Sequence, residues 1–478
     1  MLTHINLNHT LLTSDNPCFI ILILMRFFFL LLIFCVLPSP LLAVDFSFYQ
    51  QQGQKPGATL LVVGGVDGDE PGGFHAAATL VTHYHIEKGN LWIVPNLNFA
   101  AILKRQRGDM NLKFASISKQ DPQYKTVKKI QEIITRPQVD LVLNLHDGSG
   151  FYHPKRVSSQ RNPSRWGQSC VIDQQQLPGA RFGQLKKLAE KTIQQLNRKV
   201  QAKEHYFQLK NVDTASVKKD IPAKKSLSYF AVSHNKPAVA IEASKNHPVY
   251  LRTYYHLVAL ESFMQQLGIA FSRDFPLTPA GVEQIIKDDA LISLAGGRIQ
   301  LELNNMRPEL KNLPLAKQDR PAFSATNPLI SMQPEGKQYR IHYGNNRLAF
   351  LNPQYFELDR SISTVTMAID GFVQEIPFGT IIPVAKTFKV NPPKGYKTNV
   401  VGFANAKDGD DGHQHITYQQ MNSRFSIDKA GMLFRVEVYR NQRFSGMVLV
   451  DFRPQSAKKE PLVAQTAPVD LNKTEQPN

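Results

Sequence analysis

The chain is poor in cysteine, and this scarcity excludes two kinds of protein. It has three cysteines in 478 residues, and Cys18 and Cys35 lie in an N-terminal stretch that we expect to be removed. The mature chain then keeps Cys170 alone, so an exported form has no internal disulfide. The neighbouring sequence "RWGQSC" offers no evident partner histidine for a catalytic thiolate. We therefore predict a buried structural thiol rather than a cysteine protease.

Negative charge is also scarce. Aspartate and glutamate total 39, against 56 lysines and arginines, which gives a formal net charge of +17. A basic protein favours acidic or polyanionic partners. An exported protein rarely meets nucleic acid, so we expect no nucleic-acid partner. An acidic polymer such as the cell wall, or an anionic membrane surface, suits the compartment better, and charge alone does not choose between them.

No apolar run in the sequence is typical of a permanent membrane anchor. The stretch "MRFFFLLLIFCVLPSPLLAVDF" has an arginine, a short apolar run and a small residue at Ala43, which is the anatomy of a secretory signal peptide. Pro38 and Pro40 interrupt the run, which argues against a spanning helix. We predict a signal peptide over residues 1–43, with Met25 as a candidate true initiator.

The sequence after this segment changes character near residue 275. Residues 56–270 alternate short, continuous apolar runs with amphipathic stretches, which is typical of a parallel or mixed sheet covered by helices. Later segments such as "MLFRVEVYR" alternate apolar and polar residues, which is typical of all-β domains. We predict an α/β domain over 44–275, a small β domain over 276–357, an Ig-like β-sandwich over 358–455 and a disordered tail over 456–478.

Acidic and imidazole side chains follow three of the predicted strands. Asp67 and Glu70 lie in the loop "GGVDGDEPGG", His146 ends "VDLVLNLH", and Glu242 lies in "AVAIEASK". Ligands bind beyond the carboxyl ends of strands in open α/β sheets, and a catalytic zinc ion needs about three nitrogen or oxygen ligands. Asp67, Glu70 and His146 could bind zinc and leave Glu242 as a general base. The simpler alternative is solvated carboxylates and a hydrogen-bonded histidine.

Five motifs in order carry a family resemblance: "GGVDGDEPGG", "RQRGDMN", "NLHDGSGFYHP", "NPSRWGQS" and "AVAIEASK". Together they resemble the zinc carboxypeptidases of the carboxypeptidase A-like superfamily, and most of all the peptidoglycan DL-carboxypeptidases that set cell shape in curved and helical Gram-negative bacteria. The resemblance implies a mixed-sheet catalytic domain followed by two small all-β domains, one zinc ion and a periplasmic location. It also implies removal of the terminal diaminopimelate from tripeptide stems of muropeptides. The β domains are candidates for contacts with other cell-wall or cell-shape proteins.

The resemblance also implies roles for individual residues. Glu70 and His146 match zinc ligands, and Asp67 occupies the position of the first ligand. Glu242 matches the general base. Arg107 matches the arginine that polarises the scissile carbonyl and stabilises the oxyanion.

Asp67 departs from the family pattern. The superfamily usually has histidine at this position, and we expect glutamine in the cell-shape branch. Two carboxylates cancel the 2+ charge of zinc, whereas a neutral first ligand leaves about +1. We therefore hypothesise a weaker Lewis acid and a less acidified water in this chain.

A second departure concerns the pocket for the substrate's terminal carboxylate. Asn111 matches one half of the usual Asn-Arg pair, but Leu112 follows it in this chain. Lys113 or Arg105 could compensate, and the sequence does not choose between them.

Two further residues are candidates for substrate contact. Ser228 lies fourteen residues before Glu242, where a hydroxyl group could reach the substrate, although a bare serine is more often an ordinary helix or loop residue. Trp166 could shape the substrate cleft or simply hold a loop in place.

Two rival functions remain open at this point. One is a zinc deacylase of the aspartoacylase-like branch, which shares a glycine-rich acidic loop. The other is a catalytically impaired scaffold that binds the cell wall, which Asp67 and Leu112 make plausible. Metal analysis of the purified protein separates the scaffold from the enzymes.

Overall fold

The computed structural model describes residues 46–216, 221–288, 290–316, 321–403 and 409–454. The chain divides into two units, Met1–Val44 and Asp45–Asn478, and all that follows concerns the second. The predicted signal peptide and C-terminal tail lie outside the described residues. Within the described ranges, no helix combines the length and the apolar character needed to cross a membrane.

The first part of this unit is built on an eight-stranded mixed sheet. Its main path runs β1-β3-β2-β4-β9-β7-β8, and β10 pairs with β3. The pairs β2–β3, β2–β4, β4–β9 and β7–β8 are parallel, whereas β1, β10 and β7 make antiparallel pairs with their neighbours β3, β3 and β9. The strands are β1 (Tyr49–Gln52), β2 (Lys55–Val63), β3 (Tyr84–Val94), β4 (Leu141–Gly148), β7 (Ser169–Ile172), β8 (Gln208–Asn211), β9 (Ala238–Ser244) and β10 (Ala270–Arg273).

Helices cover this sheet, which confirms the predicted α/β class. Helix α7 contacts α2, α5 and α8, and it ends at Gly268, whose φ of +71° suits a residue without a side chain. Every residue of β4 is buried, as a strand covered on both faces requires. The helices are α2 (Pro71–His83), α3 (Phe99–Lys104), α4 (Tyr124–Thr135), α5 (Leu185–Asn197), α6 (Leu227–Ser233), α7 (Val249–Leu267) and α8 (Pro279–Asp288).

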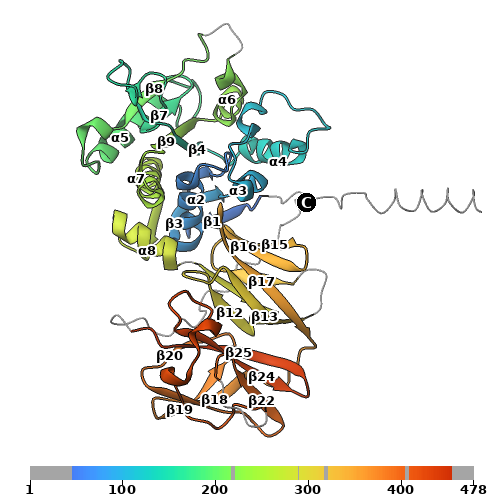
Figure 1. The fold of residues 1–478 in the computed structure, drawn as a ribbon. Helices are drawn as coiled ribbons and strands as arrows, with labels where there is room; N and C mark the ends of the chain where they lie inside the picture. Colours follow the sequence, from blue (N-terminus) through green and yellow to red (C-terminus); the bar gives the residue numbers. More distant parts are fainter. Residues whose placement is uncertain (1–45, 217–220, 289, 317–320, 404–408, 455–478) are drawn as a thin grey trace, which may run out of the picture. The chain divides into compact units, whose positions relative to one another are not determined.

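The rest of the described chain is almost entirely β-structure, as its alternating pattern predicts, apart from α8 (Figure 1). Two sheets follow the order β12-β11-β14 and β13-β17-β16-β15. Their strands are β11 (Leu291–Leu294), β12 (Ile299–Glu302), β13 (Glu309–Ala316), β14 (Phe323–Ala325), β15 (Ile330–Glu335), β16 (Gln338–Tyr343) and β17 (Asn346–Phe356).

Two more four-stranded sheets enclose a common apolar core near the C-terminal end of the described chain. Their orders are β19-β18-β21-β23 and β20-β25-β24-β22. The strands are β18 (Thr364–Ile369), β19 (Phe372–Pro377), β20 (Ile381–Pro383), β21 (Thr387–Asn391), β22 (Tyr396–Val400), β23 (Ile416–Thr417), β24 (Leu433–Arg440) and β25 (Arg443–Asp451). The domain boundaries near 275, 357 and 455 stay predictions.

Candidate metal centre

Three neighbouring parallel strands bring the candidate ligands together. Strands β2, β4 and β9 are adjacent and parallel, so their carboxyl ends lie at one edge of the sheet. The loop after β2 carries Asp67 and Glu70, β4 carries His146, and β9 carries Glu242 directly beside His146 in the register. Residues separated by up to 175 positions thus meet because of the parallel pairing.

Asp67, Glu70 and His146 form a compact, buried ligand set. One ligand atom from each lies within 4.8 Å of the others. The Nδ1 atom of His146 lies 2.8 Å from Oε2 of Glu70 and 3.6 Å from Oδ2 of Asp67. Two carboxylate oxygens and one imidazole nitrogen are a donor set that suits zinc. The residues present therefore fit a bound metal ion.

The loop that carries the two carboxylates depends on a glycine. Gly68 packs so closely on α3 that a Cβ atom would lie 2.1 Å from the backbone carbonyl of Ala101. Its amide nitrogen also donates a hydrogen bond to the carbonyl of Gln106, and Oδ1 of Asp67 accepts one from the amide of Gly108. These contacts fix the position of the loop and of the Asp67 carboxylate within it.

The charges in this cluster depend on one another. Burial opposes protonation of His146, but the Glu70 carboxylate and hydrogen bonds to both carboxylates raise the His146 pKa well above its usual value. Burial raises the pKa of Glu70, and His146 opposes that shift. Burial also acts to raise the pKa of Asp67, but His146, Arg107 and Lys245 lower it overall. Without a metal, a proton on His146 thus balances the carboxylates, and a dication would replace that proton.

Glu242 is a carboxyl group whose pKa is shifted toward neutral pH. Burial raises its pKa to about 8; the charge of His146 opposes this shift, whereas the surrounding carboxylates add to it. The side chain is not among the three clustered ligands, and the residue keeps partial exposure. A carboxylate whose pKa lies near the working pH is effective in general acid–base catalysis.

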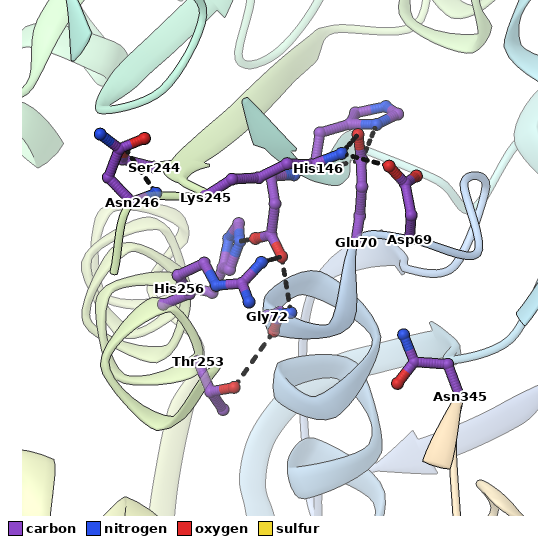
Figure 2. A network of polar contacts seen from close by, with 12 residues as sticks. Asp69, Glu70, Gly72, His146, Ser244, Lys245, Asn246, Thr253, His256 and Asn345 are labelled. Carbon is purple, nitrogen blue, oxygen red and sulfur yellow. Dashed lines mark hydrogen bonds and ion pairs between the residues drawn. The ribbon is translucent and has the colours of Figure 1, made fainter. Parts of the chain in front are cut away.

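Asp69, the third carboxylate of this loop, pairs with a lysine that follows β9. Its Oδ2 atom accepts a 2.6 Å hydrogen bond from Nζ of Lys245. The same ammonium group lies 3.5 Å from Oε1 of Glu70 (Figure 2). Lys245 therefore joins the end of β9 to the metal-site loop, and the cation offsets some of the loop's negative charge.

The candidates for the carboxylate pocket are mostly occupied by other contacts. Oδ1 of Asn111 accepts a hydrogen bond from the amide of Leu227, and Leu112 is 49% exposed. Lys113 pairs with Asp109 and Asp121, at 3.1 and 2.8 Å. Leu112 has no charge, and the Lys113 ammonium is already paired with two aspartates. Neither residue therefore replaces the free arginine of the usual Asn-Arg pair.

Arg105 is also engaged. Its guanidinium donates hydrogen bonds to the backbone carbonyl of Asn345 and to Oδ1 of Asn346. Arg107, two residues later, is exposed, and its charge acts on Asp67. Of these two arginines, Arg107 is the one whose charge reaches the ligand set.

The remaining two candidates lie on the elements around the strand ends. Ser228 is buried in α6, one residue after Leu227. Trp166 is 38% exposed, and its backbone and Cβ lie so close to Gly148 that only glycine fits there. Trp166 is thus positioned beside the end of β4, which also carries His146.

Lys210 was not predicted from the sequence. Its Nζ atom lies 4.0 Å from the ring centre of Trp166 and 4.3 Å from that of Tyr152. The ammonium also donates hydrogen bonds to the carbonyls of Pro163 and Arg165. Burial lowers the Lys210 pKa, although the charge of Glu242 opposes this shift. Nothing in the sequence around Lys210 distinguishes it from other lysines in short strands. Its contact with the rings of Tyr152 and Trp166 could therefore not be predicted from the sequence.

Family models match two parts of the chain. Residues 28–287 match a family described as the catalytic part of a carboxypeptidase controlling helical cell shape. Residues 358–453 match the C-terminal domain of a metallo-carboxypeptidase. No match to a curated protein was found.

Solved structures of one bacterial protein are similar to most of this chain. The apo form of the cell shape determinant protein Csd4 from Helicobacter pylori is 33% identical and has a TM-score of 0.76, with 85% of this chain and 100% of that chain covered. Its tripeptide-bound form has 34% identity, the same coverage and a TM-score of 0.75. The mDAP-bound form, described as a D,L-carboxypeptidase, has 34% identity, 84% and 99% coverage and a TM-score of 0.75.

These findings confirm the resemblance and the fold class that the five motifs predict. The catalytic family model alone spans more than half of the chain, and the buried ligand set Asp67, Glu70 and His146 lies within it. Membership also favours a peptidase over the aspartoacylase-like deacylase. The chain belongs to the family of metallo-carboxypeptidases that control helical cell shape.

Proposed function

We propose that this chain is a periplasmic, zinc-dependent peptidoglycan carboxypeptidase that trims tripeptide stems to dipeptides by releasing the terminal diaminopimelate. The observation that carries the proposal is the buried set Asp67, Glu70 and His146 beside Glu242, at the carboxyl ends of three parallel strands. The related Csd4 structures with bound tripeptide and mDAP support this class of substrate.

In this proposal Asp67, Glu70 and His146 hold one zinc ion, which supplies Lewis acidity to the scissile carbonyl and to water. Glu242 takes a proton from the attacking water and passes it to the leaving amine. The exposed guanidinium of Arg107 polarises the carbonyl and stabilises the developing oxyanion.

Three residues are proposed to orient the substrate. The Asn111 carbonyl is committed to Leu227, so its amide group is the part left to donate to a terminal carboxylate. Ser228 lies beside that contact, and Trp166 offers a partly exposed ring next to the end of β4. The β domains are proposed to contact the cell wall or other cell-shape proteins.

Digestion of purified tripeptide muropeptides, followed by mass analysis, tests the proposal. We expect the loss of one diaminopimelate residue, no reaction after treatment with a chelator, and recovery when zinc is restored. Muropeptides with tetrapeptide stems serve as the substrate control, because their terminal residue is different. Unchanged tripeptide after incubation with the zinc-loaded wild type would exclude this activity.

A cell-wall-binding scaffold is the second candidate. The anionic first ligand Asp67 and the exposed Leu112, where the family usually has an arginine, favour it. Elemental analysis separates the two proposals, because an enzyme requires stoichiometric zinc and a scaffold does not.

Replacement of Asp67 by glutamine is expected to alter both zinc affinity and the pH dependence of the reaction. Removal of one negative charge weakens the attraction for zinc but leaves the bound ion more electrophilic. The acidic limb of the kcat/KM profile should therefore move to lower pH. Competition with a chelator measures the zinc affinity, and a pH–rate profile measures the shift of the acidic limb.

Asp67→Asn is the matched control, because it removes the charge without lengthening the side chain. If charge is the cause, both variants move the acidic limb in the same direction. A glutamine variant with the zinc affinity and pH profile of the wild type would contradict the hypothesis.

A further inference from the structure

A fully buried carboxylate lies directly behind the ligand set. Asp147 follows His146 in β4, and its side chain has no exposed surface. Its Oδ2 atom accepts hydrogen bonds from the amide of Gly72 at 2.8 Å and from Nη1 of Arg252 at 2.6 Å. Its Oδ1 atom lies 3.1 Å from Nε2 of His256. Figure 2 labels Gly72 and His256 within this network of polar contacts.

These contacts join three separate elements. Asp147 lies in β4, Gly72 lies in the first turn of α2, and both Arg252 and His256 lie in α7. The partners are 75, 105 and 109 positions away along the chain. One carboxylate therefore fixes the start of α2 and the N-terminal half of α7 against the end of β4.

Asp147 is linked to two of the proposed ligands through its neighbours in the chain and through its backbone amide. His146 precedes Asp147 in the chain, and Glu70 lies two residues before Gly72. The backbone amide of Asp147 also donates a 3.1 Å hydrogen bond to Oε2 of Glu70, the oxygen that faces His146. Movement of Asp147 would thus change the separation of Glu70 and His146.

Local packing leaves this arrangement little freedom. A Cβ atom on Gly72 would lie 2.5 Å from Oδ1 of Asp147 and 2.6 Å from Cβ of Arg252. Nε of Arg252 and Nδ1 of His256 are buried and have no hydrogen-bond partner among the described residues. Asp147 is therefore the acceptor on which both α7 side chains depend, and an unpaired charge in this position is costly.

We propose that Asp147 is a positioning residue that holds Glu70 and His146 at the separation a metal ion requires. It acts through Gly72, Arg252 and His256 and does not touch the metal. The inference rests on the proposed function only in that the ligand set binds zinc. Outer contacts of this kind typically change metal affinity by about 10–100-fold.

Asp147→Asn tests the inference in the full chain. The variant keeps the size of the side chain but presents an NH₂ group to donors that need an acceptor. We expect zinc affinity, measured by competition with a chelator, to fall about 10–100-fold. We also expect the visible absorption spectrum of the cobalt-substituted protein to change, because ligand geometry changes.

Glu261→Gln is the matched control. Glu261 also lies in α7 and is partly buried, and it accepts a 2.7 Å hydrogen bond from Tyr84 and pairs with Arg273 at 3.0 Å. Neither partner contacts the ligand set, so this variant should lose stability in urea but keep its zinc affinity and cobalt spectrum. Equal losses of affinity in both variants would reduce Asp147 to a general stabilising role.

His256→Leu provides a second test if the asparagine variant does not fold. It removes one of the three donors and leaves the Arg252 pair in place, so we expect a smaller loss of zinc affinity, of severalfold. Wild-type affinity and an unchanged cobalt spectrum in either folded variant would overturn the inference. Because these measurements contain no substrate, they stand apart from the muropeptide digestion, whose failure would concern the proposed function alone.

Discussion

Replacing Glu242 by glutamine is expected to lower kcat by about 10²–10⁴-fold, because the amide cannot accept a proton from water. The side chain keeps nearly the same size, and Glu242 is not among the three clustered ligands. Zinc content and KM should therefore change little. Steady-state kinetics on tripeptide muropeptides, together with elemental analysis of the same preparation, measure both.

Glu242→Asp is the companion variant. It keeps a carboxylate but moves it back by one methylene group, so its kcat should lie between those of the wild type and the glutamine variant. A glutamine variant that kept more than about a tenth of the wild-type kcat would be incompatible with general-base catalysis by this residue.

Replacing Glu70 by alanine is expected to reduce zinc affinity by more than about 100-fold, because loss of an outer contact alone costs about 10–100-fold. The substitution removes one proposed ligand. It also removes the acceptor for the amide of Asp147 and the oxygen that lies 2.8 Å from His146. Chelator competition on the purified variant measures the loss, and muropeptide cleavage should disappear with it.

Asp69→Ala is the control for this experiment. Asp69 is the adjacent carboxylate of the same loop, but its contact is with Lys245 and it is absent from the clustered set. We expect its zinc affinity to remain within about tenfold of the wild type. If Asp69→Ala lost as much affinity as Glu70→Ala, loop charge rather than direct ligation would explain both results.

Much of the fold follows from local patterns in the sequence. The continuous apolar runs that became β2, β4 and β9 have no polar face, so they had to be covered on both sides. The alternating apolar and polar residues of β24 and β25 likewise predict strands of an all-β domain, and both segments are strands in the structure. Helix α8 was missed, because it lies just beyond the change of pattern near residue 275.

The candidate site could be predicted only in part. Asp67, Glu70, His146 and Glu242 each follow or end a predicted strand, and parallel pairing brings such positions together. Nothing in the sequence indicated that Lys210 would lie against Trp166, or that Arg105 would contact Asn345 and Asn346. These contacts depend on which surfaces meet after folding.

The sequence by itself determined the chemistry available at this site: a glycine-rich acidic loop, a strand-end histidine and a third carboxylate in a basic chain. Tertiary structure alone decided which charges face one another. In the sequence, Asp147 is only a polar residue that follows His146, and nothing indicates its partners. In the structure it binds groups 75 to 109 positions away along the chain. Arg252 and His256 lie one helical turn apart, which is a weak signal without knowledge of what α7 packs against. The physical reason is that the pairing of buried charges is set by long-range packing, which local patterns do not encode.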